Sequence, residues 1–236
     1  MTNDYQRTDR MADLIEDNYH LLQVISRFGM SLGFGDKTVE EVCQMHQVDT
    51  NTFLAIINFM HSGYTQVAED LSHLSMPALI DYLRQSHIYF LDYLFPKIRR
   101  ELRVVLDNGN GSSNSINQLI SKQFDKYISE VRKHMQHEDA VLFPYVEKLL
   151  QGEIDESFVL KTYSKHHHSM DNELRELKKI LIKYSPQNSG KNELNAVLYE
   201  IYGCEDELDA HCKAEDYIFV PAVYDLEERV RHHANR

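Results

Sequence analysis

One short pattern of residues occurs twice in the chain and could bind a metal ion. It reads His-x-x-x-Glu-Asp with a proline six residues after the glutamate, first from His134 to Pro144 and again from His211 to Pro221. On an α-helix, residues four apart lie on one face, so each copy presents an imidazole beside a carboxylate. Both copies interrupt otherwise apolar stripes, where a buried carboxylate is costly unless its charge is compensated. The pattern therefore predicts a bound cation.

Two further histidines, His87 and His167, interrupt apolar helical stripes elsewhere in the chain. His87 lies 19 residues before the expected end of its helix, and His134 lies 18 residues after the expected start of the next. At about 1.5 Å per residue, antiparallel helices bring both to nearly one level. The corresponding separations for His167 and His211 are 17 and 20 residues. We therefore expect all four histidines to converge on one layer of a helical core.

The predicted ligands are imidazoles and carboxylates, and the absence of a thiolate among them limits which metal ions they suit. Such a set suits iron or manganese, and zinc is compatible. Two bridging carboxylates with four terminal imidazoles can hold two ions in a helical bundle. The predicted ligands are His87, His134, Glu138, His167, His211 and Glu215. Whether Asp171 or a tyrosine (Tyr127, Tyr163) joins them stays open from the sequence.

The remaining periodicity predicts the elements that position these groups. Long amphipathic helices are expected over about 77–106, 116–150, 156–184 and 191–230, separated by segments rich in Asn, Gly, Ser or Pro. Short loops make successive long helices antiparallel neighbours. The expected fold is all-α, an up-down-up-down four-helix bundle over residues 75–236.

Helix-start signals within residues 1–74 predict a small helical domain. Thr38 with Glu41 three residues later is a capping-box signal, and another helix is expected to begin near Asp49. Two short helices across a turn are also compatible with a DNA-reading helix-turn-helix. However, this region has four basic against eleven acidic residues, which argues against phosphate contacts.

The composition excludes several classes of protein. Only 9 Gly and 5 Pro in 236 residues argue against a fold of many short strands. The formal net charge of −12 argues against nucleic acid, and no apolar run approaches the roughly 20 residues of a membrane span. Three cysteines without a CxxC pair, and a polar N-terminus unlike a signal peptide, predict a cytoplasmic protein. A homodimer is compatible with the sequence.

The repeated pattern resembles the signature of a known family. The chain is similar to the hemerythrin-like cation-binding domain, which has HxxxE followed by Phe-Pro on two helices. It more closely resembles the di-iron iron-centre repair (RIC-type) proteins, which join a short N-terminal domain to such a bundle. The resemblance implies two non-haem irons under an oxo or hydroxo bridge, with Glu138 and Glu215 bridging and the four histidines terminal. It also implies repair of iron–sulfur clusters damaged by oxidative or nitrosative stress, iron donation or nitric oxide chemistry.

Two positions depart from this resemblance. The repair family carries adjacent cysteines before a Gly-Lys-Thr-Leu-like stretch, whereas this chain reads Leu-Gly-Phe-Gly-Asp-Lys-Thr-Val over 32–39, and its nearest thiol is Cys43. Family roles that need those thiols are therefore not implied. Oxygen-carrying hemerythrins place a second histidine four residues after the ligand of the third helix, where this chain has Asp171. That difference disfavours a simple oxygen carrier.

We expect a di-iron stress-response protein that binds iron and small ligands (O₂, NO or peroxide) in support of damaged iron–sulfur proteins. Each iron would keep one open coordination position, so redox chemistry is compatible with the site and enzyme activity stays open. An alternative is a sensor of O₂, NO or iron that signals through residues 1–74. A metal-free helical scaffold, whose stability would be indifferent to chelators, is a third interpretation.

Overall fold

The computed structural model describes residues 4–67, 71–107, 115–156, 158, 160, 167–184 and 190–234. Their regular secondary structure is helical, apart from an isolated bridge between Arg10 and Thr38. The chain forms two compact units. The first comprises Met1–Ser86, Leu142–Phe158 and Ala210–Arg236, and the second comprises His87–Val141 and Val159–Asp209. Among the described helices, none combines the length and the apolar character that crossing a membrane requires.

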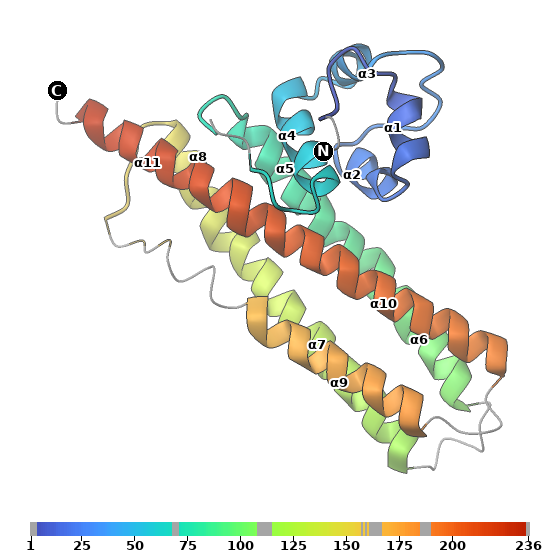
Figure 1. Ribbon diagram of the computed structural model, residues 1–236. Helices are drawn as coiled ribbons and strands as arrows, with labels where there is room; N and C mark the ends of the chain where they lie inside the picture. The colour runs from blue at the N-terminus through green and yellow to red at the C-terminus, as the bar shows by residue number, and fades with distance from the viewer. Residues whose placement is uncertain are drawn as a thin grey trace. The chain divides into compact units, whose positions relative to one another are not determined.

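The first unit begins with four short helices (Figure 1): α1 (Met11–Asp17), α2 (Leu21–Arg27), α3 (Val39–Met45) and α4 (Thr50–His61). The predicted helix starts are confirmed. Thr38 and Glu41 form a reciprocal capping box, and the Asp49 carboxylate accepts a hydrogen bond of 2.8 Å from the Thr52 amide. These caps satisfy amide groups that have no partner within the first turn of a helix.

The same unit also contains parts of the long helices. They are α5 (Met76–Ile88) up to Ser86, α8 (Phe143–Leu150), the π-helix η4 (Glu215–Phe219) and α11 (Val220–Ala234). The rings of Phe143 and Phe219 meet edge to face at 5.7 Å. Phe28 contacts Tyr82 at 4.9 Å, and Phe59 contacts Tyr217 at 5.9 Å. Aromatic packing therefore joins the N-terminal helices to α5 and η4. The domain boundary expected between residues 74 and 75 stays a prediction.

The second unit is built on four long helical segments. It contains the π-helix η1 (Tyr89–Leu94), α6 (Phe95–Asp107), α7 (Ser115–His137), the π-helix η2 (Glu138–Leu142) up to Val141, α9 (His167–Tyr184) and α10 (Lys191–Ala214) up to Asp209. Ion pairs connect the helices in a ring: Arg99–Asp125, Lys126–Glu173, Lys178–Glu205 and Lys97–Glu200. Buried apolar side chains fill it, among them Ile98, Leu102, Phe124, Val131, Leu177 and Ile201. The expected all-α four-helix bundle with additional N-terminal helices is confirmed.

One predicted boundary is wrong. The third long helix was expected from residue 156, but Glu156, Phe158 and Leu160 are not α-helical, and the described helix begins at His167. Within the first unit, the ring of Phe158 stacks on Tyr145 at 3.9 Å, and Glu156 pairs with Arg231 at 2.8 Å. These contacts with α8 and α11 hold the segment in an irregular conformation. Residues 161–166 lie outside the described residues.

Candidate metal centre

In the second unit, the Glu138 carboxylate faces two imidazoles. Its Oε2 lies 3.3 Å from Nε2 of His87, and its Oε1 lies 3.1 Å from Nε2 of His134. His87 comes from α5, His134 from the last turn of α7, and Glu138 is the first residue of η2. The structure therefore brings together three of the predicted ligands, with a separate imidazole at each oxygen of one carboxylate.

Asp139 orients the imidazole of His87 from the other side of the ring. Nδ1 of His87 lies 3.0 Å from Oδ1 of Asp139. When Nδ1–H donates to this carboxylate, Nε2 is left with its lone pair directed at the site, as a metal-binding imidazole requires. No role for Asp139 was predicted, although an aspartate follows the glutamate in both copies of the pattern.

In the first unit, the second copy of the pattern has similar local geometry. Nε2 of His211 lies 3.3 Å from Oε1 of Glu215, and both side chains are buried. Glu215 is the first residue of η4, as Glu138 is of η2. The spacing of four residues thus places an imidazole beside a carboxylate in both copies.

Each unit contributes a buried histidine and a buried glutamate of the kind that binds metals. His87 and Glu138 lie in the second unit, and His211 and Glu215 lie in the first. Nitrogen and oxygen donors of this kind suit iron, manganese or zinc. Two buried carboxylates also need nearby positive charge, which a cation supplies. The residues present therefore fit a bound metal.

The pKa of Glu138 shows how strongly its surroundings act on the carboxylate. Burial alone would raise this pKa, because a poorly solvated site disfavours the charged form. The imidazoles of His134 and His87 beside the carboxylate instead hold its pKa well below the ordinary value. The carboxylate is therefore ionised at neutral pH and depends on positive charge beside it.

A π-helical stretch accompanies three of the predicted ligands. η1 begins two residues after His87, whereas η2 and η4 begin at Glu138 and Glu215. Each stretch ends two residues before a proline: Pro96, Pro144 and Pro221. Proline has no amide hydrogen for the carbonyl four residues earlier and its ring crowds that carbonyl, so the regular α-helical ladder is interrupted there. Such π-bulges are frequent at functional sites.

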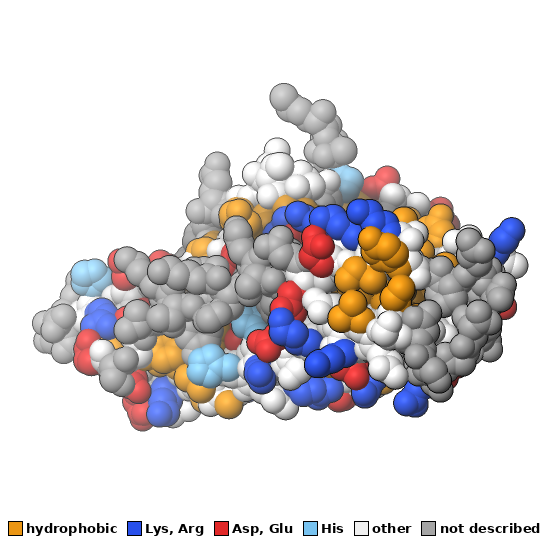
Figure 2. Space-filling view, turned by 90° about the horizontal axis from the view of Figure 1, so that it is seen from below, with side chains coloured by type: hydrophobic (Ala, Val, Ile, Leu, Met, Phe, Trp, Pro, Cys, Tyr) orange, Lys and Arg blue, Asp and Glu red, His pale blue; other side chains and the backbone are white. Residues whose placement is uncertain are grey.

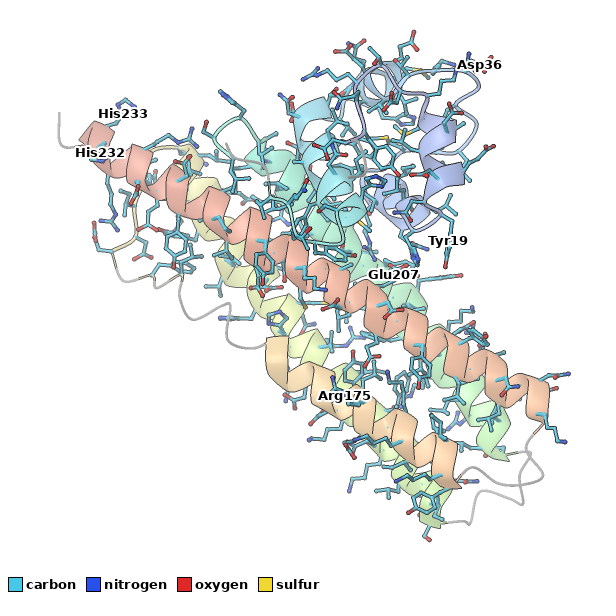
Figure 3. All side chains as sticks on the ribbon, viewed as in Figure 1. Tyr19, Asp36, Arg175, Glu207, His232 and His233 are labelled. Atoms are coloured by element: carbon cyan, nitrogen blue, oxygen red, sulfur yellow. The ribbon has the colours of Figure 1, made fainter. Side chains whose placement is uncertain are left out.

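The remaining predicted groups are placed only in part. His167 is the first residue of α9, but its side chain and that of Asp171 lie outside the described residues, as does Tyr163. Tyr127 is buried and packs against the rings of Phe95 and Phe124. His232 and His233 are exposed on α11 (Figure 3). The full six-ligand set stays a prediction.

The chain also matches a known family of cation-binding proteins. The model of a family described as the hemerythrin HHE cation binding domain matches residues 78–223, which is more than half of the 236. No curated protein matches the chain. The matched region includes both copies of the pattern and His87. The chain therefore belongs to the hemerythrin HHE cation-binding family.

Proposed function

We propose that this chain is a non-haem di-iron protein. Its terminal ligands are the imidazoles of His87, His134, His167 and His211, and its bridging ligands are the carboxylates of Glu138 and Glu215. The observation that carries the proposal is the position of Glu138, whose two oxygens lie 3.3 and 3.1 Å from imidazoles on different helices. A carboxylate with a separate nitrogen donor at each oxygen is suited to bridge two ions, and the second copy of the pattern supplies the matching half.

The protein's own residues would prepare the site for this metal pair. Asp139 fixes the orientation of His87, and buried apolar side chains one turn from the histidines, such as Val131 and Leu208, limit the entry of water. Bound iron would supply redox activity and an open coordination position for O₂, NO or peroxide. Manganese and zinc fit the same donors, so metal analysis has to identify the native ion.

We further propose that this site serves the repair of iron–sulfur clusters during oxidative or nitrosative stress, by releasing iron or by consuming the small ligands. Support comes from the family membership and from the helical region that precedes the bundle. The three cysteines, all among the described residues, form no disulfide, in keeping with a cytoplasmic location. Because the N-terminal thiol pair of the repair family is missing, the proposed role rests on the metal site alone.

A sensor is the second candidate function, and one contact favours it. Tyr217 lies in η4, two residues after Glu215, and its ring lies 5.9 Å from the ring of Phe59 on α4. A change at Glu215 on ligand binding would reach the N-terminal helices by this route. The sensor predicts a ligand-dependent change in those helices, whereas the repair protein predicts recovery of a damaged iron–sulfur enzyme.

Metal analysis of protein purified without oxygen tests the proposal. We expect two irons per chain and a near-ultraviolet oxo-bridge absorption band. The double substitution Glu138→Ala, Glu215→Ala should abolish both. The matched control is Glu130→Ala, because Glu130 is exposed on α7 about one turn before His134. A double variant that still binds two irons normally would refute the site.

A further inference from the structure

The outward face of α10 carries unusually little charge. Because successive residues of a helix are about 100° apart, seven exposed residues of α10 lie within about 60° of Tyr199. Asp206 is the charged residue of this set, and the others are Asn192, Asn195, Ala196, Tyr199, Tyr202 and Gly203. We call these seven residues the α10 face, and all of them belong to the second unit.

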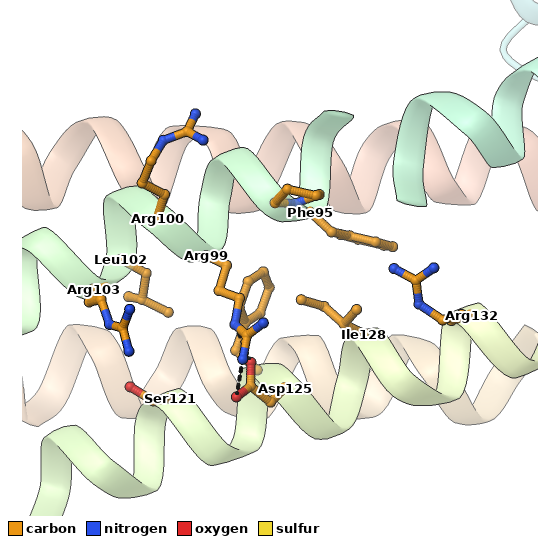
Figure 4. Close-up of a pocket in the computed structure, with 11 residues that line it drawn as sticks. Phe95, Arg99, Arg100, Leu102, Arg103, Ser121, Asp125, Ile128 and Arg132 are labelled. Atoms are coloured by element: carbon orange, nitrogen blue, oxygen red, sulfur yellow. Dashed lines mark hydrogen bonds and ion pairs between the residues drawn. The ribbon is translucent and has the colours of Figure 1, made fainter. Parts of the chain in front are cut away.

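α6, in the same unit, shows the more usual pattern of a helix face in water. Its exposed residues include Arg99, Arg100 and Arg103, and Arg99 makes a two-pronged ion pair with Asp125 of α7 at 2.8 and 3.0 Å (Figure 4). On the face of the molecule shown in Figure 2, basic side chains are likewise interspersed with acidic ones. Depletion of charge together with tyrosine is typical of the centre of a protein interface. The α10 face has that composition.

Two tyrosines occupy the middle of the α10 face. Tyr199 is 81% exposed, the largest exposed fraction among the described large hydrophobic side chains, and Tyr202 is 44% exposed. Together with Asn195 and Leu198 they line a shallow hollow of about 280 Å³. The ammonium of Lys178 lies 4.0 Å from the centre of the Tyr202 ring and holds that ring in place. A ring that is already held loses little freedom when a partner binds.

Gly203 lies one turn after Tyr199 on the same face. A glycine inside a helix is destabilising relative to alanine. A Cβ at this position would meet no other part of the described chain within 4 Å, so packing within the chain does not require the missing side chain. Gly203 and Ala196 lie on the same edge of the α10 face, and together they leave room for the backbone of another helix to approach.

The two ends of the α10 face carry opposite charges. Lys191 lies eight residues before Tyr199, and Asp206 lies seven residues after it. Both are exposed, and neither forms an ion pair within the described part of the chain. When two copies of α10 pack antiparallel with Tyr199 at the centre, residues equally far before and after Tyr199 come to the same level. Lys191 of each copy then lies beside Asp206 of the other, and the two-fold symmetry forms this pair twice.

We propose that the α10 face binds the same face of a second copy of this chain, with the two α10 helices antiparallel and Tyr199 at the two-fold axis. The placement of opposite charges on either side of the most exposed tyrosine favours a second copy over an unrelated partner, because it makes the face complementary to itself. The face covers about four turns of helix, roughly 20 Å. A contact of this size is at the small end for protein interfaces, so we expect a dimer that dissociates at micromolar concentrations.

Sedimentation velocity of the full chain over a range of concentrations tests this proposal. We expect a reversible equilibrium between monomer and dimer. Tyr199→Lys should weaken the association roughly a hundredfold, because it removes the central aromatic contact and places two like charges at the two-fold axis. The matched control is Tyr19→Lys, because Tyr19 is also strongly exposed, at 69%, but lies in the first unit (Figure 3). This control should leave the dissociation constant unchanged.

Exchanging the charges tests the antiparallel arrangement. Lys191→Glu and Asp206→Lys should each weaken the dimer roughly tenfold, because each change replaces two attractive contacts with two repulsive ones. The double variant Lys191→Glu, Asp206→Lys restores opposite charges and should recover the affinity of the parent chain. A double variant as weak as the single variants would refute the antiparallel pairing.

Three results of the sedimentation experiment would overturn the proposal. They are a chain that stays monomeric at millimolar concentration, a dimer that Tyr199→Lys leaves intact, and an open-ended series of oligomers, since a two-fold contact closes on itself. Circular dichroism of each variant establishes that it is folded. In the parent chain, amide chemical shifts that change with concentration should cluster on α10 around Tyr199, which locates the interface without any substitution. Changes that spare α10 would contradict the proposal.

Discussion

The two copies of the His-x-x-x-Glu-Asp pattern have the same local geometry in different surroundings. The imidazole and carboxylate are 3.1 Å apart in the first copy and 3.3 Å apart in the second, and each glutamate begins a π-helix. The side chain of His134, however, is 10% exposed, whereas that of His211 is 1% exposed. Solvent reaches the first imidazole and hardly reaches the second.

The shared geometry of the two copies and their different burial have different physical causes. The four-residue spacing and the proline six residues later are local, so they act alike wherever the pattern occurs. Burial depends on which helices cover the pattern, and it differs between the copies. Four experiments test how far the two copies are equivalent, and they are given in order of decreasing expected effect.

The largest effect should come from removing the metal. If the cation compensates Glu138 and Glu215, a chelator should lower the free energy of unfolding by about 3 kcal/mol when free metal had been present at 100 times its dissociation constant. Chemical denaturation with and without chelator measures the change. In the double variant Glu138→Ala, Glu215→Ala, the chelator should have no effect. Equal sensitivity of variant and parent chain would mean that the two copies do not share a metal centre.

Asp139→Asn should weaken metal binding roughly tenfold or more, because His87 loses the carboxylate that orients its ring. Competition with a chromogenic chelator gives the affinity. Asp216→Asn is the matched change in the second copy. If it lowers the metal affinity by a similar factor, the aspartate after each glutamate has the same role in both copies. The prediction fails if Asp139→Asn leaves the affinity unchanged.

Substituting the prolines tests whether they cause the π-helices. Pro144→Ala and Pro221→Ala each restore an amide donor, so the metal-free chain should become more stable by about 1 kcal/mol, a fraction of the ~3 kcal/mol that proline costs within an α-helix. Metal affinity should fall, because a regular α-helix turns the following residues out of register. Thermal unfolding and metal titration measure the two effects. A variant that is more stable but binds metal with unchanged affinity would show that the π-helices do not contribute to metal binding.

The smallest effect concerns a position where the copies differ in residue type, since Cys212 follows His211 where Met135 follows His134. Cys212 is only half-buried, whereas Cys43 and Cys204 are buried. Burial also raises the pKa of the Cys43 thiol to about 11, so its reactive thiolate is scarce at pH 8 and increases only as the pH approaches that value. Alkylation followed by mass spectrometry should modify Cys212 first. Faster labelling of Cys43 at pH 8 would contradict this order.

Local patterns predicted much of this molecule. The capping residues Thr38 and Asp49 marked helix starts correctly, because caps act through neighbouring amides. The apolar stripes predicted the long helices, and the four-residue spacing predicted the pairing of His134 with Glu138 and of His211 with Glu215. The irregular segment at Phe158 was missed, because its conformation depends on Tyr145 and on α11.

Local sequence was enough to specify the helical class, the net negative charge and the two His-x-x-x-Glu-Asp patterns, since periodicity and side-chain chemistry act over one or two turns of helix. The packing of separate helices was needed to show that Asp139 orients His87 and that Arg99 of α6 pairs with Asp125 of α7. It also decided how deeply each imidazole is buried. These features depend on which surfaces of separate helices face each other, and packing of the whole chain sets that choice.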